Sequence, residues 1–375
     1  MAKISSTDLD VFAVALGGNV FGWTADEVES FAVLDGYAAG GGNFIDTADM
    51  YSAWAPGNSG GESERIIGRW LSSRKRRADM IVATKVGKHP KLQGLSAKTI
   101  AAAAEDSLKR LNTDYIDLYY AHADDEKTPL EETLGAFDSL VRAGKVRYIA
   151  ASNYTAPRLA QALATSAREG FARFVALQQH YNLMERDEYE GELAGVVKKE
   201  GLSSLPYFAL AKGFLTGKYR PNSRVESARG ESASAYLTEK GLKVLAALDE
   251  VAFEQNAPIA SIALAWLAAQ PDSGRSDCKC TKGEPAWCDH AVCGDSFDRR
   301  PDPKTQRCER LIRRNEKARI SEGDCGSCRR RRDCVCVNCE IAAGSSGITR
   351  SGSGSIFASD TRRWLPATPQ AISPL

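Results

Sequence analysis

The first 277 residues of this chain contain no cysteine, although the whole chain has ten. A body without cysteine needs no disulfides and fits the reducing cytoplasm, where we expect the protein to reside. The chain also lacks an apolar run long enough to span a bilayer, and residues 1–10 lack the basic-then-apolar layout of a secretory signal. Its formal charge is only +1, which argues against a general role on nucleic acids or membrane surfaces.

The cysteines mark a change of composition near residue 271. Beyond Pro271 lie all ten cysteines and 15 arginines, with Arg329 to Arg332 in a row, and no apolar period is sustained. At 375 residues the chain could hold one large domain or two ordinary ones. The sequence therefore predicts a folded body over residues 1–271 and an unlike tail over residues 272–375.

The body reads as repeated units of a strand followed by a helix. Seven short apolar runs have strand character: Val11–Leu16, Asn43–Thr47, Met80–Thr84, Tyr115–Ala121, Val146–Ala151, Phe174–Gln178 and Leu202–Tyr207. Segments such as Ile100–Leu111, Leu130–Arg142 and Ile259–Ala269 have helical spacing. Continuous apolar strands that alternate with helices indicate a parallel sheet covered on both faces, and their even spacing favours a (β/α)8 TIM barrel over an open doubly wound sheet. The eighth strand should begin where the composition changes, so we expect it and the last helix to be missing or degraded.

Polar residues stand at the ends of five successive predicted strands. They are Asp46, Lys85, His122, Ser152 with Asn153, and Gln178. In a barrel, the carboxyl ends of the strands face the shared active-site mouth. A single lysine or histidine in such a place is more often a solvated loop residue or a buried imidazole than a catalyst. Six such residues on five strands predict a site.

Ordered motifs around these residues resemble those of the aldo-keto reductase family. The run Gly-Gly-Asn-Phe-Ile-Asp46-Thr-Ala-Asp-Met-Tyr51 is followed by Ala83-Thr84-Lys85 and Asp114-Tyr-Ile-Asp-Leu-Tyr-Tyr-Ala-His122. Ala151-Ser152-Asn153-Tyr154, Gln178 with Tyr181-Asn182-Leu183, and residues 206–219 continue the pattern in order. The resemblance covers about residues 10–271 and implies an NADPH-dependent oxidoreductase that reduces aldehydes or ketones to alcohols.

The resemblance implies four catalytic residues. Reduction of a carbonyl by hydride transfer leaves charge on its oxygen, so a proton donor must lie beside it. Tyr51 matches that donor, Lys85 the cation beside it and Asp46 the partner that holds Lys85, because a neighbouring ammonium favours the ionised phenol. His122 matches the residue that orients the carbonyl. Trp23 and Trp54 could wall an apolar substrate pocket, although loop aromatics are as often packing residues.

The resemblance also implies a set of NADP ligands, and we predict no metal ligands in the sequence. Ser152, Asn153 and Gln178 match the ligands of the nicotinamide carboxamide, and Tyr207 matches the aromatic residue that stacks on the nicotinamide ring. The loop that covers the pyrophosphate is matched by Phe208, Ala209, Leu210, Ala211, Lys212, Gly213 and Lys218. The serine, arginine and glutamine side chains that bind the adenosine 2′-phosphate in the family would come from the segment that departs from the pattern.

The departure near codon 271 is what a change of reading frame would produce. Each residue nearly fixes its first two codon bases, so the frame one base downstream is also constrained. For Gly274 to Thr281 that frame permits Val, Ala, Pro, Ile, Ala, Ser, Ala and Arg, and at Pro285 and Ala286 it permits Gln and Leu, as the family expects. Near Gln306 to Cys308 it permits an ending typical of the family's final helix. We therefore interpret the tail as out-of-frame sequence.

Two other interpretations of the tail remain. Cys325-x2-Cys328 and Cys334-x-Cys336-x2-Cys339 have zinc-like spacing, and the arginine run could contact phosphates. Against zinc, cysteine and arginine both accumulate when GC-rich DNA is read out of frame. The low apolar content of the tail, with Ser351 to Ser355 and Pro366 to Pro374, also predicts disorder.

The sequence leaves three functional hypotheses. The first is a reductase of small carbonyl substrates, with no nucleic-acid or membrane partner. The second is a cofactor-binding regulatory protein, because the potassium-channel beta subunits are similar to the same family. The third is an inactive frameshifted product whose barrel cannot close. The presence of Asp46, Tyr51, Lys85 and His122 together favours the enzyme.

Overall fold

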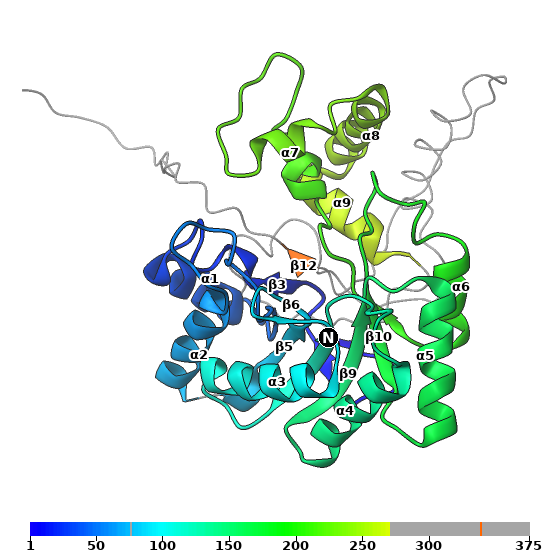
Figure 1. The fold of residues 1–375 in the computed structure, drawn as a ribbon. Coiled ribbons are helices and arrows are strands. Elements are labelled where there is room, and N and C mark those ends of the chain that lie inside the picture. Colours follow the sequence, from blue (N-terminus) through cyan, green and yellow to red (C-terminus); the bar gives the residue numbers. More distant parts are fainter. Residues whose placement is uncertain (76, 271–337, 340–375) are drawn as a thin grey trace, which may run out of the picture. The chain divides into compact units, whose positions relative to one another are not determined.

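A curled parallel sheet forms the centre of the computed structural model, which describes residues 1–75, 77–270 and 338–339. The order of its strands is β11-β10-β9-β8-β5-β4-β3-β12. Their bounds are β3 (Ala15–Gly17), β4 (Phe44–Asp46), β5 (Ile81–Val86), β8 (Ile116–Ala121), β9 (Val146–Ser152), β10 (Phe174–Gln178), β11 (Ser203–Ser204) and β12 (Asn338–Cys339). Every ladder in this sheet is parallel, and helices cover its outer face (Figure 1). This arrangement confirms the predicted (β/α)8 type of fold.

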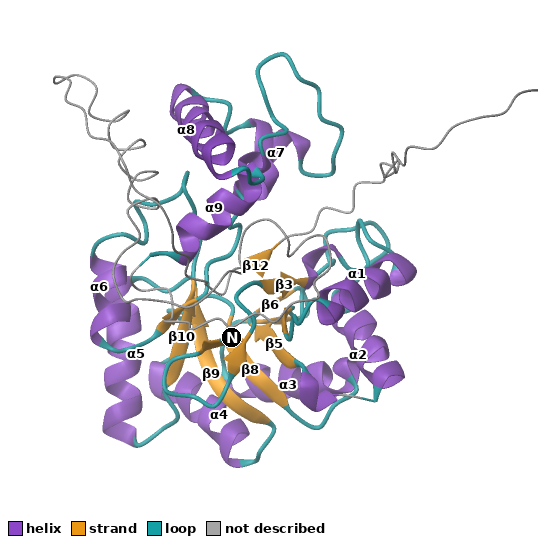
Figure 2. Cartoon of the chain, turned by 180° about the vertical axis from the view of Figure 1, so that it is seen from behind, coloured by secondary structure: helices purple, strands orange, loops and turns teal. Residues whose placement is uncertain are grey.

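Most helices follow the strands along the chain and lie around them, and the last three lie together above the sheet in the view of Figure 2. They are α1 (Glu27–Ala39), α2 (Glu62–Arg74), α3 (Ala97–Leu111), α4 (Leu130–Arg142), α5 (Ala156–Glu169), α6 (Glu192–Lys199), α7 (Gly230–Ser234), α8 (Glu239–Gln255) and α9 (Ile259–Ala268). Three short 3-10 helices are η1 (Gly18–Val20), η2 (Arg77–Asp79) and η3 (Ala211–Thr216). The helices predicted from spacing at α3, α4 and α9 are present within a few residues of their expected bounds.

Side-chain caps determine where several of these helices begin. Asp26 accepts a hydrogen bond from the backbone of Glu29, and the Glu29 carboxylate accepts one in return, which makes a capping box at the start of α1. Ser96 and Thr155 cap α3 and α5 through their hydroxyls. Each cap satisfies backbone N–H groups that have no partner inside the helix and contributes about 1 kcal/mol.

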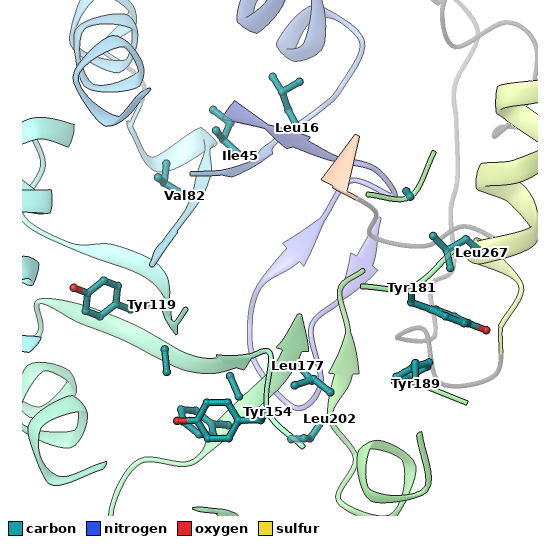
Figure 3. Close-up of a cluster of buried hydrophobic side chains, with 14 of the residues drawn as sticks. Leu16, Ile45, Val82, Tyr119, Tyr154, Leu177, Tyr181, Tyr189, Leu202 and Leu267 are labelled. Atoms are coloured by element: carbon teal, nitrogen blue, oxygen red, sulfur yellow. The ribbon is translucent and has the colours of Figure 1, made fainter. Parts of the chain in front are cut away.

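The sheet separates two buried clusters, because alternate residues of each strand point to opposite faces. Leu118 and Tyr120 of β8 belong to a cluster that includes the inward residues of the other strands, whereas Tyr119 and Ala121 belong to the larger cluster packed against the helices. Leu16, Ile45, Val82 and Tyr119 from four strands meet in that outer cluster (Figure 3). The strands are therefore buried on both faces, which accounts for their continuous apolar runs.

The N-terminus differs from the prediction that Val11–Leu16 is one strand. Asp10–Val11 (β2) pairs with Ala2–Lys3 (β1) as an antiparallel hairpin, and the barrel strand begins only at Ala15. The hairpin places Ile4 and Leu9 in the inner cluster, so its apolar residues fill one end of the barrel. Val11 in the hairpin and Ala15 and Leu16 in the barrel strand are all buried, so the apolar run from Val11 to Leu16 is continuous in the sequence. The sequence alone therefore does not show where the hairpin ends and the barrel strand begins.

The two edges of the sheet lie at β11 and β12. β12 is two residues long and pairs with β3, and no ladder between β11 and β12 is present in the part of the chain that the structure describes. The segment from residue 272 to 280, where we predict that no regular eighth strand forms, lies outside the described residues. So do the zinc-like cysteines up to Cys336 and the region predicted to be disordered.

Two further strands form a short hairpin outside the large sheet. β6 (Lys88–His89) and β7 (Leu92–Gln93) form an antiparallel hairpin after β5. No helix within residues 1–75 and 77–270 combines the length and the apolar character that a membrane crossing requires.

Candidate active site

The predicted site residues meet at the carboxyl ends of the barrel strands. Asp46 is the last residue of β4, Ser152 of β9 and Gln178 of β10, whereas Lys85 lies one residue before the end of β5 and His122 directly follows β8. Since parallel strands end at the same edge of the sheet, residues up to 132 positions apart come into contact, as Asp46 and Gln178 do.

Asp46, Lys85 and Tyr51 form a buried hydrogen-bonded group. Lys85 Nζ donates to Asp46 Oδ2 at 2.5 Å, to the Thr47 carbonyl at 2.7 Å and to the Tyr51 hydroxyl at 3.0 Å. The Asp46 and Lys85 side chains are 1% and 0% exposed, so the ion pair is screened by little water. The three donor positions of the ammonium are thereby occupied, which fixes it beside the phenol.

Burial governs the protonation of this group. Burial raises the pKa of Tyr51 well above its ordinary value, and the negative charge of Asp46 acts in the same direction. Burial lowers the pKa of Lys85, while the nearby Asp46 carboxylate opposes that effect. Tyr51 therefore keeps its proton at neutral pH and can donate it. The sequence argument considered only the neighbouring ammonium, which favours the phenolate, and did not include the opposing effect of burial.

His122 faces Tyr51 across the cavity. The two rings have centroids 6.2 Å apart at an interplanar angle of 73°. Burial lowers the pKa of His122 well below its ordinary value, and the charges of Lys85 and then Lys88 lower it further. The imidazole is therefore neutral, and a neutral imidazole donates one hydrogen bond and accepts another.

Ser152, Asn153 and Gln178 bring hydroxyl and amide groups to the cavity wall. Asn153 has a positive φ of 55° and donates from Nδ2 to the Ser152 hydroxyl at 3.0 Å and to the His122 carbonyl at 2.9 Å. Gln178 donates from Nε2 to Asp46 Oδ1 at 3.1 Å. Gln178 thus touches the acidic residue of the buried Asp46–Lys85–Tyr51 group, a contact that the sequence did not predict.

Tyr207 and Phe208 form the next part of the wall, after β11. The Tyr207 hydroxyl donates to Asn153 Oδ1 at 2.8 Å, and the Tyr207 ring stacks on that of His180 with centroids 5.3 Å apart and planes 10° apart. The buried Asn182 holds this turn, because its Nδ2 donates to the Phe208 carbonyl at 2.9 Å. His180 and Asn182 were not among the predicted site residues.

The remaining predicted loop residues continue from Phe208 without lining the cavity. Phe208, Ala211 and Lys212 have φ values of 53°, 48° and 57°, a left-handed conformation that non-glycine residues seldom adopt. Gly213 has a φ of 98°, which glycine tolerates. Lys218 is exposed and lies over the Tyr219 ring at 5.4 Å. The loop of residues 208–213, with Ala209 and Leu210 inside it, therefore lies next to the cavity and carries local strain, as functional loops often do.

These groups line one cavity of about 350 Å³. Its wall is made by Gly17, Asn19, Met50, Tyr51, Trp54, Lys88, His122, Ser152, Asn153, Gln178, Tyr207 and Phe208. Such a volume lies at the lower end of small-molecule pockets, which usually combine an apolar surface with a few polar groups. Seven of the predicted catalytic and cofactor-binding residues line the cavity directly, as does Trp54, and Asp46 and Lys85 lie beneath them.

The sequence did not predict Asn19, Lys88 or Arg229 as site residues. Asn19 lies two residues after the end of β3, so a strand-end rule extended by one residue would have found it. Lys88 lies in the short strand β6, three residues after Lys85 of β5. From the sequence, a lysine at such a position is expected to be a solvated loop residue. Arg229 places its guanidinium 5.6 Å from the Trp23 ring and 6.0 Å from the Phe208 ring, from a position distant in the chain. No local signal marks such a contact.

Comparisons with known proteins agree with this geometry. A sequence model of the aldo/keto reductase family matches residues 13–276. "Protein tas" of Escherichia coli is 34% identical over 298 residues, covering 72% of this chain and 86% of that protein. An aryl-alcohol dehydrogenase of Pestalotiopsis microspora is 32% identical over 278 residues, covering 70% and 69% of the two chains.

A further relative is a probable voltage-gated potassium channel subunit beta from Oryza sativa subsp. japonica. It is 31% identical over 262 residues, covering 67% of this chain and 78% of that protein. Members of the matched family are oxidoreductases that generally bind a nicotinamide cofactor and act on small carbonyl compounds. From the match over most of the barrel, the chain belongs to the aldo/keto reductase family.

Proposed function

We propose that the protein is an NADPH-dependent reductase that converts aldehydes or ketones to alcohols, with Tyr51 as the proton donor. The observation that carries the proposal is the contact of the Lys85 ammonium with Asp46 at 2.5 Å and with the Tyr51 hydroxyl at 3.0 Å. A buried acid whose conjugate base is held beside a fixed cation is suited to give a proton to a developing alkoxide.

Each catalytic residue then has a separate task. Tyr51 donates its proton to the carbonyl oxygen, and Lys85 stabilises the phenolate that remains. Asp46 keeps Lys85 charged and in place against the cost of burial. His122, neutral and 6.2 Å from Tyr51 between ring centroids, donates a hydrogen bond that orients the carbonyl. The bound cofactor would supply the hydride.

Four residues of the cavity wall fit a nicotinamide. A planar ring with a carboxamide needs an aromatic face and mixed donors and acceptors. Tyr207 offers a ring whose other side is supported by His180, and Ser152, Asn153 and Gln178 offer hydroxyl and amide groups. Lys218, Lys212 and the strained backbone of residues 208–213 would hold the pyrophosphate.

We also propose that the reading frame changes near codon 271, in the gene or in its sequencing. The family match ends at residue 276, close to that codon, which supports the proposal. The chain with the frame restored, called the frame-restored chain below, would regain the 2′-phosphate ligands. Resequencing the gene across codon 271 is the test, and a clean read with no disruption would overturn the proposal.

A regulatory role similar to that of potassium-channel beta subunits is the second candidate, favoured by the named relative. A measurement of carbonyl turnover distinguishes the reductase from the regulatory protein. In the frame-restored chain, Tyr51→Phe should reduce carbonyl reduction by about 10²–10⁴-fold while NADPH binding, titrated by fluorescence, changes little. Wild-type turnover in the Tyr51→Phe variant would show that the assigned mechanism is wrong.

A further inference from the structure

Lys88 is a cation in the wall of the cavity that the reduction mechanism does not use. It lies in β6, in the hairpin that follows β5, and pairs with Gln93 across the hairpin. Lys88 is exposed, although the surrounding protein partly desolvates its ammonium and thereby lowers the pKa of Lys88. A lysine that is partly desolvated normally gains from an anionic partner.

The protein provides no such partner in the described part of the chain. Lys88 takes part in none of the ion pairs there, and none of the residues lining the cavity is an aspartate or a glutamate. By contrast, Lys85, three residues earlier, is paired with Asp46. The charge of Lys88 is therefore available to something that enters the cavity.

The position of Lys88 places it on the side where the carbonyl would lie. In the sheet order, β5 lies between β4, which precedes Tyr51, and β8, which precedes His122. The charge of Lys88 reaches His122, whose pKa it helps to lower. The proposed nicotinamide ligands lie at or after the ends of β9, β10 and β11, which lie beyond β8 in the sheet order. Lys88 is thus placed to meet the substrate rather than the cofactor.

Trp54 adds an apolar surface on the same side. Its side chain is 45% exposed, its ring centroid lies 6.1 Å from that of Tyr51, and it packs edge-on against Trp23 at 5.6 Å. A tryptophan braced by two rings but open to the cavity can pack against a planar ligand. A cation and an aromatic surface together suit a planar ring that carries a negative charge.

We propose that Lys88 is a specificity-determining residue that selects aromatic carbonyl substrates bearing a carboxylate. This inference rests on the proposed function. The carboxylate binds the Lys88 ammonium, the ring packs on Trp54, and the carbonyl points to Tyr51 and His122. The mechanism of reduction is unchanged, and only the choice of substrate depends on Lys88.

The test uses binding to the 375-residue chain, so that it does not depend on hydride transfer. The ligands are the 3- and 4-isomers of hydroxymethylbenzoate and the methyl ester of each, measured by isothermal titration calorimetry. These alcohols avoid imine formation with lysines and resemble the products. At least one acid should bind more tightly than its ester, and Lys88→Met should reduce that preference roughly tenfold.

A matched control is Lys91→Met, which removes the same charge from the same hairpin but lies outside the cavity wall. It should leave the preference unchanged, and Lys88→Arg should retain it. Equal binding of acid and ester in the wild type, the same preference in Lys88→Met, or no binding of any ligand would overturn the inference. A failure of Tyr51→Phe to affect turnover would instead overturn the proposed function and leave this binding result standing.

Discussion

Two groups of predicted site residues, in the cavity wall or next to it, differ in what holds them. The strand-borne group, Asp46, Lys85 and Gln178, lies within regular strands, is buried, and is joined by hydrogen bonds between its members. The loop-borne group, defined here as Asn153, Tyr207, Phe208, Lys212 and Lys218, is half-buried or exposed. Three of its members, Asn153, Phe208 and Lys212, have positive φ values.

The difference corresponds to two tasks. Proton transfer needs groups whose separation is fixed within a fraction of an ångström, and strands packed on both faces provide that rigidity. Binding and release of a large cofactor need a wall that can move, and loops provide it at some cost in backbone strain. Substitutions in the strand-borne group should therefore affect both stability and turnover, whereas those in the loop-borne group should affect affinity alone.

The largest effect is expected for Lys85→Met in the frame-restored chain. Removal of the ammonium leaves the Asp46 carboxylate buried without its charge partner, and breaking a buried pair in this way costs about 3–5 kcal/mol. Urea denaturation measures the loss of unfolding free energy, and carbonyl reduction should be lost as well.

A second substitution checks the cause of that loss. The double variant Lys85→Met/Asp46→Leu removes both charges and should recover much of the stability but none of the activity. Lys91→Met, which removes an exposed lysine, serves as the control and should change neither property. If Lys85→Met were as stable as the wild type, the strand-borne group would not be held as described.

A smaller effect is expected for Tyr207 in the loop-borne group. Tyr207→Leu removes a ring stacked on His180 and should raise the NADPH dissociation constant roughly 2–10-fold, without a change in unfolding free energy. Tyr207→Phe keeps the ring and removes only the hydrogen bond to Asn153, so it should lie closer to the wild type. Fluorescence titration measures both, and a large loss of stability in either variant would remove the distinction between the groups.

The smallest effect concerns Asp49, which lies behind the strand-borne group and is 1% exposed. Burial raises the pKa of the Asp49 carboxyl well above its ordinary value, and the nearby Glu64 carboxylate raises it further. As the pH rises, Asp49 loses its proton in the unfolded chain before it does so in the folded one. Its contribution to stability therefore falls with rising pH.

Asp49→Asn cannot ionise and should lack this decline. Relative to the wild type, the variant should become more stable as the pH is raised from about 4 towards 8, where an ordinary aspartate is already ionised. Urea unfolding curves at several pH values measure the difference. A difference that stays constant with pH would show that Asp49 does not titrate in this way.

The same contrast explains which features the sequence could predict. Seven strands and three helices were placed from apolar runs and helical spacing, because burial on two faces leaves a continuous apolar signal. The strand-end rule then located Asp46, Lys85, His122, Ser152 and Gln178, since parallel strands bring their ends together. The first strand was placed too early, because Val11 belongs to a separate hairpin that is equally apolar.

Features that depend on loop conformation could not be predicted. The stack of His180 on Tyr207 and the approach of Arg229 to Trp23 join positions far apart in the chain, and neither has a local pattern. The sequence did not predict Lys88 as a site residue, because a lone lysine after a strand is usually solvated. Its proposed role in substrate choice depends on the absence of carboxylates among the described residues that line the cavity. The roles of the site residues in reduction remain predictions.

The account is tested most directly by following the hydride itself. The frame-restored chain is incubated with benzaldehyde and NADPH that carries deuterium at both hydrogen positions of nicotinamide C4, and the product is examined by mass spectrometry. We predict benzyl alcohol with a single deuterium on its carbinol carbon, formed by the frame-restored chain, with little product from the 375-residue chain and from Tyr51→Phe. Alcohol without deuterium, or equal labelled product from the Tyr51→Phe variant, would contradict the account.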